Sequence, residues 1–480
     1  MSTVNNQFDV VVVGSGPAGV HAAYPLIKAG LRVAMIDGGL DSKKQEEKLQ
    51  EFPDAKLTKS GHYYDFVKES SYVFNKTYEL LQIKSNIDII QSLARGGLSE
   101  VWHGICDFFS ENELVAIGLP SGEIKREYKE ISKLIKLNFR TPLDLHGRLL
   151  LEKAKGNTHR KNSMYQVPLV FPYRTNSFIE ELRRLKNFVY LPNQLVYSVK
   201  EKRNHVEIQS FSIDKKDEST ARTSFLILAA GSINTTRIIL RSFKLYNYKT
   251  SFLTKANYFV PCLHLRSLGK KNDSKKGKYG QLVISSKESN RGVDSFFIQL
   301  YRLNPLFLHK GLPYISIPKI IALPLLSVLA PYVVIADIKF PAFESKMTFC
   351  KLKKETGEKD TLEISFKETN KDILRHKREY NKIRQQLWSL GLFPLRTIFG
   401  YITSHYAGGV FSKQTQKKTQ KMLSVDKNGK LYKANKIYIA DSSSWKILPA
   451  KPPTLTIMAN AARVGKNVLK RINKNKDLQK

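Results

Sequence analysis

The first segment of this 480-residue chain that could do chemistry is a glycine-rich turn. Gly14, Gly16 and Gly19 form the pattern GxGxxG directly after an apolar run, and a helix-compatible segment follows. In this setting the first glycine permits a tight turn, the second lets the backbone approach a pyrophosphate, and the third lets helix and strand pack closely. We therefore predict a dinucleotide site over these glycines, Pro17 and Ala18, where a helix N-terminus adds N–H donors.

An acidic residue completes this opening motif. Asp37 ends the strand expected over residues 31–36, where a carboxylate accepts hydrogen bonds from the adenosine ribose hydroxyls. A carboxylate at this position disfavours a cofactor with a phosphate on the ribose 2′-oxygen, because the two negative charges would repel each other. The opening segment is compatible with NAD or FAD, and the alternative is a glycine-rich turn in another kind of α/β protein.

The elements that must position these residues alternate in type along the chain. Continuous apolar runs at 9–13 and 225–230 indicate parallel strands buried on both faces. Polar and apolar residues alternate at 195–200 and 206–211, which indicates antiparallel strands. Helical periodicity is expected near residues 124–136, 176–185, 372–392 and 454–472. We predict an α/β fold with a discontinuous Rossmann-like domain and a second, mainly antiparallel-sheet domain.

Four further segments recur in a recognisable order. They are residues 94–104 (ARGGLSEVWHG), 225–235 (FLILAAGSINT), 404–409 (SHYAGG) and 437–458. With the glycine motif, they resemble the glucose/methanol/choline (GMC) FAD-dependent oxidoreductases. The nearest branch is that of pyranose oxidase and of flavoproteins associated with bacterial surface polysaccharides. The resemblance implies an FAD-binding domain over 1–110, 186–260 and 420–480, and a substrate domain with insertions over 111–185 and 261–419.

The resemblance also implies which residues hold FAD. Arg95, Gly96, Gly97, Leu98 and Ser99 would run beside the pyrophosphate and the flavin edge, in the same element as Trp102. Val101 stands where pyranose oxidase carries the histidine that links covalently to flavin, so we expect non-covalent FAD. His103 could contact the flavin or be an ordinary packed or solvated histidine.

Other residues are assigned to FAD by the same resemblance. Val196 would lie at the adenine edge, Ala230 and Gly231 near the adenosine, and Thr454 in the C-terminal motif. Asp441 would accept a hydrogen bond from a ribityl hydroxyl or from a backbone N–H near the pyrophosphate. The alternative role for Asp441 is simple helix capping.

His405 is the expected catalytic base. Oxidation of an alcohol by a flavin needs a group that takes the hydroxyl proton while hydride leaves the carbon for flavin N5, and imidazole is suited to this. The family usually carries Asn or His at the position of Pro452, whose side chain can neither donate nor accept a hydrogen bond. Either His405 works alone, or Lys451 or Tyr406 substitutes, or the chemistry differs.

The resemblance implies oxidation of a hydroxyl to a carbonyl on a sugar or polyol, with lipid-linked and nucleotide-linked sugars included in this substrate class. Because of Pro452, one alternative is an FAD-binding protein that has lost ordinary alcohol oxidation and serves another flavin reaction or acts as a scaffold. Another alternative is a basic interaction protein that uses the fold as a platform.

The charge balance bears on partners and location. The chain has 79 Lys and Arg against 42 Asp and Glu, a net charge of +37. The basic residues are mostly Lys in short scattered patches, which favours a solvated surface, then an anionic membrane, over nucleic acid. The uncharged run 320–336, interrupted by prolines, could be a buried hairpin or could lie on a bilayer. With three separate cysteines and no signal-peptide pattern, we expect a cytoplasmic protein without a metal site, either free or peripheral on the inner face of the membrane.

Overall fold

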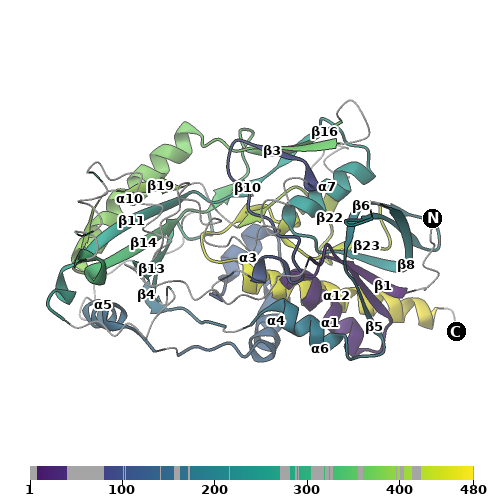
Figure 1. Ribbon diagram of the computed structural model, residues 1–480, viewed down its shortest axis with the longest axis horizontal. Helices are drawn as coiled ribbons and strands as arrows, with labels where there is room; N and C mark the ends of the chain where they lie inside the picture. The colour runs from purple at the N-terminus through teal and green to yellow at the C-terminus, as the bar shows by residue number, and fades with distance from the viewer. Residues whose placement is uncertain are drawn as a thin grey trace.

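A computed structural model describes most of the chain. The described residues are 8–40, 80–100, 102, 104–140, 142–155, 163–170, 173–215, 217–270, 280, 282–286, 289, 291–303, 318, 324, 328–354, 360–395, 397–400, 405–412 and 423–478. Two large sheets dominate these residues, one in each half of the view in Figure 1. The predicted α/β class, with a Rossmann-like region and an additional antiparallel sheet, is confirmed.

The first sheet contains the predicted dinucleotide-binding strands. Its order is β5-β2-β1-β8-β7-β6, and β23 pairs with β8. The bounds are β1 (Phe8–Val13), β2 (Val33–Ile36), β5 (Phe188–Leu191), β6 (Gln194–Glu201), β7 (Val206–Ser212), β8 (Glu218–Leu228) and β23 (Ile437–Ile439). The β1, β2, β5, β8 and β23 pairings are parallel, whereas β7 is antiparallel to both neighbours.

Both faces of this sheet are covered, which explains its continuous apolar strands. Val10 and Val12 pack with α1 (Pro17–Lys28) and α12 (Thr454–Asp477). Val11 and Val13 lie in the cluster that contains α7 (Ser232–Ser242) and a smaller sheet. That smaller sheet has the order β3-β17-β16-β9, with bounds β3 (Ile83–Ser85), β9 (Lys249–Ser251), β16 (Phe349–Lys354) and β17 (Asp360–Ser365).

The second sheet is antiparallel throughout; one of its faces is apolar, and the other carries both apolar and polar side chains. Its order is β18-β11-β14-β13-β12-β4, with β19 also on β11. The bounds are β4 (Ser163–Gln166), β11 (Asn257–His264), β12 (Leu282–Ser285), β13 (Phe297–Arg302), β14 (Val333–Lys339), β18 (Leu392–Pro394) and β19 (Ile398–Gly400). Tyr258, Ile298 and Ile338 face α10 (Asn370–Ser389), seen beside the sheet in Figure 1.

The other helices and most of the short strands lie between the strands of these sheets in the chain. The helices are α3 (Glu111–Ile117), α4 (Ser121–Leu134), α5 (Leu145–Lys155) and α6 (Thr175–Leu182). Short strands are β10 (Leu253–Thr254), β15 (Ala342–Phe343), β20 (Tyr406–Ala407), β21 (Phe411–Ser412), β22 (Ser424–Val425) and β24 (Ile447–Leu448). The domain ranges remain a prediction; β11 lies on both sides of the boundary expected at residue 260.

The uncharged run 320–336 is partly a core segment. Its last residues, 333–336, belong to β14 and are buried in the second sheet, so they are not available to a bilayer. Most of residues 320–327 lie outside the described part. Among the described residues, no helix combines the length and apolar character needed to cross a membrane.

Candidate active site

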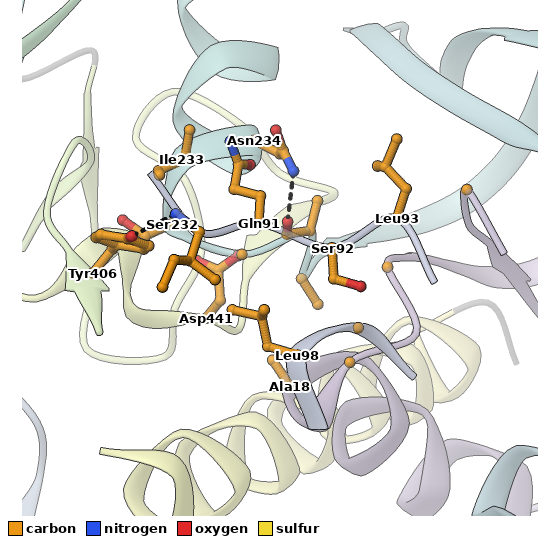
Figure 2. A pocket seen from close by; sticks show the side chains of 18 of the residues that line it. Ala18, Gln91, Ser92, Leu93, Leu98, Ser232, Ile233, Asn234, Tyr406 and Asp441 are labelled. Atoms are coloured by element: carbon orange, nitrogen blue, oxygen red, sulfur yellow. Dashed lines mark hydrogen bonds between the residues drawn. The ribbon is translucent and has the colours of Figure 1, made fainter. Parts of the chain in front are cut away.

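A cavity of about 910 Å³ lies between the two sheets and collects residues from both. Figure 2 shows Ala18 and Leu98 below this cavity, with Ser232, Ile233 and Asn234 above it. Fourteen of the residues predicted to form the site line it: Gly14, Gly16, Pro17, Ala18, Asp37, Gly97, Ser99, Trp102, Val196, Ala230, Gly231, His405, Asp441 and Thr454. The separate segments that the sequence analysis assigned to one site therefore meet at this cavity.

The glycine loop has the geometry expected of a phosphate cradle. Gly14 has φ +102°, and a Cβ placed on it would come within 2.5 Å of the Ala229 carbonyl oxygen. A Cβ on Gly19 would lie 1.8 Å from the Gly14 oxygen, so Gly19 serves packing and does not line the cavity. A Cβ on Gly16 would meet nothing closer than 4.0 Å. It would instead occupy space in the cavity, where a dinucleotide backbone is expected.

Asp37 is tied to this loop at the end of β2. Its carboxylate accepts hydrogen bonds from the Ser15 hydroxyl at 2.5 Å, from Tyr190 at 3.0 Å and from the Gly39 N–H at 3.0 Å. Burial raises the pKa of Asp37, and the hydrogen bonds from Ser15 and Tyr190 oppose that rise. The carboxylate therefore shapes the glycine loop as well as facing the expected ribose position.

The segment after Ala94 is held by short hydrogen bonds across the cavity wall. The Gly96 N–H donates to Ser15 Oγ at 2.9 Å, and the Gly96 carbonyl accepts from Ser99 and Thr175, each at 2.8 Å. Gly96 therefore joins the segment to the glycine loop without lining the cavity. Arg95 also points elsewhere, to an ion pair with Glu180. Thr175, which the sequence did not single out, fixes this segment from α6.

Three helices begin at the cavity. Thr454 is the first residue of α12, Gly231 precedes α7 and Gly16 precedes α1. None of the three has a side-chain cap, so their first backbone N–H groups have no capping oxygen from the described side chains. Such termini favour anions and hydrogen-bond acceptors. With the open Gly16 position, this arrangement fits FAD, which carries a pyrophosphate and many acceptor atoms.

Two predicted cofactor contacts also have structural roles. Asp441 accepts from Thr235 Oγ1 at 2.5 Å and from the Ser443 N–H at 3.0 Å, so its carboxylate caps the short turn Ser442–Ser444 while lining the cavity. The capping role of Asp441 is therefore observed, and its contact with the cofactor stays a prediction. Trp102 donates from Nε1 to the Tyr173 carbonyl at 3.2 Å. Val101 and His103 lie outside the described residues.

His405 lies on the second-sheet side of the cavity, beside a buried lysine. Lys255 Nζ is 3.4 Å from His405 Nδ1 and donates to the carbonyls of Ala450 at 3.0 Å and Lys451 at 2.7 Å. Burial, then the charges of Lys255 and Lys339, lower the pKa of His405 well below its usual value. His405 is therefore held in its neutral, proton-accepting form, and Lys255 connects it to the segment before Pro452.

The side chain of Lys451 lies away from the cavity, contrary to the geometry that a catalytic base requires. Its Nζ is 2.9 Å from Glu113 and 3.4 Å from Asp294. Burial lowers the pKa of Lys451, but Glu113, Asp294 and Asp107 outweigh burial and raise it. The ammonium is thus an ion-pair partner, and only the Lys451 carbonyl reaches toward His405 through Lys255.

Sequence reasoning missed the polar side chains that the second sheet contributes. Asn257, Gln299, Asp337 and Lys339 line the cavity although they belong to largely buried strands. A signal was present: Asp337 and Lys339 are two residues apart in the otherwise apolar run VVIADIK, so both lie on one face.

Comparison with known proteins supports this interpretation of the fold. Residues 8–107 match the family described as pyridine nucleotide-disulphide oxidoreductase. Among solved structures, the chain is similar to pyridoxine 4-oxidase from Mesorbium loti, with 12% identity and a TM-score of 0.64, over 96% of this chain and 99% of the other. A search of curated protein sequences finds no match.

The likeness to the solved structure extends over nearly the whole chain and shows the fold, and the family match covers the segment that contains the glycine loop. These findings support FAD as the cofactor, in agreement with the glycine loop and the three helix N-termini.

Proposed function

We propose that the protein oxidises an alcohol group to a carbonyl, with His405 as the base. The observation that carries the proposal is the position of a neutral imidazole in the cavity where the FAD-binding loops meet the second sheet. When bound, FAD supplies the two-electron acceptor for such a reaction. The order of the four motifs further supports a GMC-like enzyme acting on CH–OH groups, with FAD held non-covalently.

The chain's own contribution is to receive the hydroxyl proton at His405. Because the pKa of His405 is lowered, the imidazole is unprotonated at neutral pH and can accept. Lys255 contacts one ring nitrogen of His405, Nδ1, and so fixes the ring beside the cavity that His405 lines. Pro452 and Pro453 also line this end and present no hydrogen-bonding side chain, so His405 works without the second residue usual in the family.

For the substrate class we retain a sugar or polyol, including one linked to a lipid or nucleotide. The polar atoms that the second sheet presents to the cavity support this choice. The similar structure is named as an oxidase of pyridoxine, which suggests that small alcohols of other kinds belong in the same substrate screen.

The alternative is an FAD-binding protein that no longer oxidises alcohols and serves another flavin reaction or a scaffold role. The observation in its favour is Pro452, because the cavity lacks a second titratable side chain at that position. An alcohol reduces the bound flavin if the protein is an alcohol oxidoreductase, and no alcohol reduces it if the alternative holds.

Anaerobic flavin bleaching tests the proposal. The FAD-loaded protein is mixed with a panel of sugars, polyols and pyridoxine, and loss of flavin absorbance is followed for wild type and His405→Ala. We expect at least one alcohol to bleach the flavin and the variant to be slower by about 10²–10⁴-fold.

His205→Ala is the matched control, because His205 lies on the β6–β7 hairpin, outside the cavity lining, where its ring contacts Glu207. Equal rates in wild type and His405→Ala would remove the base role. Absence of bleaching by every alcohol would favour the non-oxidising alternative.

We further propose that the basic surface contacts an anionic membrane or a phosphate-bearing substrate in the cytoplasm. The net charge of +37 supports this idea. Deletion of residues 320–336 is unsuitable as a test because 333–336 are buried in β14. Membrane contact can be tested by sedimentation with phosphatidylserine vesicles, compared with phosphatidylcholine vesicles and repeated at high salt. Equal binding to both lipids would contradict the proposed contact with an anionic membrane.

A further inference from the structure

The second sheet presents a row of polar side chains to the cavity. Residues 257 and 259 of β11, 299 and 301 of β13, and 337 and 339 of β14 alternate along their strands and line the cavity. In the strand register, Asp337 lies opposite Phe259 on one side and Gln299 on the other. The opposite face of the same strands is apolar and packs on α10. The polar residues are therefore on the face directed toward the site.

These side chains hold one another in fixed orientations. Lys339 Nζ donates to Asp337 Oδ2, and it donates to Gln299 Oε1 at 2.6 Å. Tyr301 also donates its hydroxyl to Gln299 Oε1, at 3.1 Å. Since two donors converge on the amide oxygen, the amide nitrogen of Gln299 is directed away from them. The cluster is pre-organised before any ligand arrives.

Three polar atoms in this cluster have no hydrogen-bond partner among the described residues. They are Gln299 Nε2, Asp337 Oδ1 and Asn257 Oδ1. Their residues are only 3%, 6% and 6% exposed. Leaving a buried polar atom unsatisfied costs about 1–3 kcal/mol, so three such atoms on residues that line one cavity are an incentive for a polar ligand to bind there.

The chemistry of these atoms defines the ligand. Asp337 and Asn257 offer acceptors, which require hydroxyl donors, and Gln299 offers a donor, which suits a hydroxyl or ring oxygen. Lys339 and Asp337 already neutralise each other, so the cluster has no formal charge to pair with an ionic group. Phe259 and Tyr301 line the same end with aromatic surface.

We propose that Asn257, Gln299 and Asp337 are the specificity-determining residues for a neutral polyhydroxylated substrate, which they orient with its hydroxyls toward the second sheet. This inference rests on the proposed function, because it names the substrate class of the same cavity. Lys339 is a positioning residue that holds Asp337 and Gln299.

Binding can be measured separately from turnover. The FAD-loaded protein is titrated anaerobically with myo-inositol, D-glucose and xylitol, and with the charged analogues D-gluconate and D-glucosamine, while changes in the flavin spectrum are recorded. We expect saturable changes with at least one neutral polyol and weaker binding of the charged analogues. Gln299→Leu and Asn257→Leu should each weaken polyol binding by about tenfold, the equivalent of ~1.4 kcal/mol.

Gln209→Leu is the matched control, because Gln209 is an exposed amide on β7 away from the cavity lining. FAD content and thermal stability of all variants show whether the fold is retained. A polyol that binds without bleaching the flavin would contradict the proposed oxidation but support this inference. Bleaching that is equally efficient in Gln299→Leu, in Asn257→Leu and in wild type would support the oxidation and overturn the inference. Failure of every neutral polyol to bind, or tighter binding of a charged analogue, would also overturn it.

Discussion

The two large sheets contribute to the cavity in opposite ways. The first sheet is apolar on both faces at its centre and contributes the loops and helix N-termini that follow its strands, such as the one at Gly16. The second sheet contributes side chains from the middle of its strands, such as Asp337 and Gln299. The backbone of one region and the side chains of the other therefore meet at one cavity.

Because the two sheets contribute in different ways, substitutions in them should have different effects on ligand binding. Recognition by backbone donors depends on glycine and on close packing, so almost any side chain added there interferes. Recognition by strand side chains depends on residue type, so single substitutions can alter the ligand without altering the fold.

Gly16→Val is expected to abolish FAD binding while leaving the fold intact. Apart from its chain neighbours, a Cβ on Gly16 comes no closer than 4.0 Å to a protein atom, and Gly16 lines the cavity, so the added methyl groups project into the cofactor space. We expect FAD content to fall by at least about tenfold, measured by the ratio of flavin to protein absorbance with circular dichroism as the check on folding. Gly122→Val, at another position without close neighbours, is the control. Full FAD content in Gly16→Val would contradict the backbone role of the first sheet.

Lys451→Met is expected to destabilise the protein by about 3–5 kcal/mol, because it leaves Glu113 and Asp294 buried without their cation. Chemical unfolding measures this loss, and Lys427→Met on an exposed position is the control. Adding Glu113→Gln should recover part of the stability. If Lys451→Met were fully stable but slow in flavin bleaching, the original catalytic hypothesis for Lys451 would be restored.

His21→Gln should make the protein less sensitive to acid. His21 is buried on α1, with a hydrogen bond to Tyr173 and a pKa lowered by burial from 6.5 to about 3. The unfolded chain binds the proton first, so stability is present above pH 6.5 and is lost as the pH falls below it, by about 2 kcal/mol at pH 5. Unfolding at pH 7 and pH 5 measures this loss in both proteins. An equal loss in wild type and variant would show that His21 is not its source.

Lys255→Met should raise the pKa of His405 because it removes a neighbouring positive charge. The acid side of the pH profile for flavin bleaching should therefore move to higher pH. Lys346→Met, on an exposed turn, is the control. A lower rate with an unchanged profile would instead assign Lys255 a purely structural role in holding the segment before Pro452.

Much of the first sheet was predictable, because its signals are local. The glycine pattern, the apolar runs and Asp37 follow one another within a short stretch, and the structure places them as expected around one turn. The second sheet was predicted only as a class. The direction of Lys451 and the burial of Lys255 depend on residues far away in sequence, such as Glu113 and Ala450.

The sequence by itself determined the dinucleotide-binding fold, since the signals for a strand, a glycine turn and a helix lie in adjacent residues. It also pointed to His405 through the order of the motifs. Only the tertiary structure decided that Lys255 lies beside His405 and that Asn257, Gln299 and Asp337 converge on one end of the cavity. The physical reason is that strand pairing and packing between the sheets bring together residues that are far apart in the sequence. The site that these residues form therefore exists only in the folded protein.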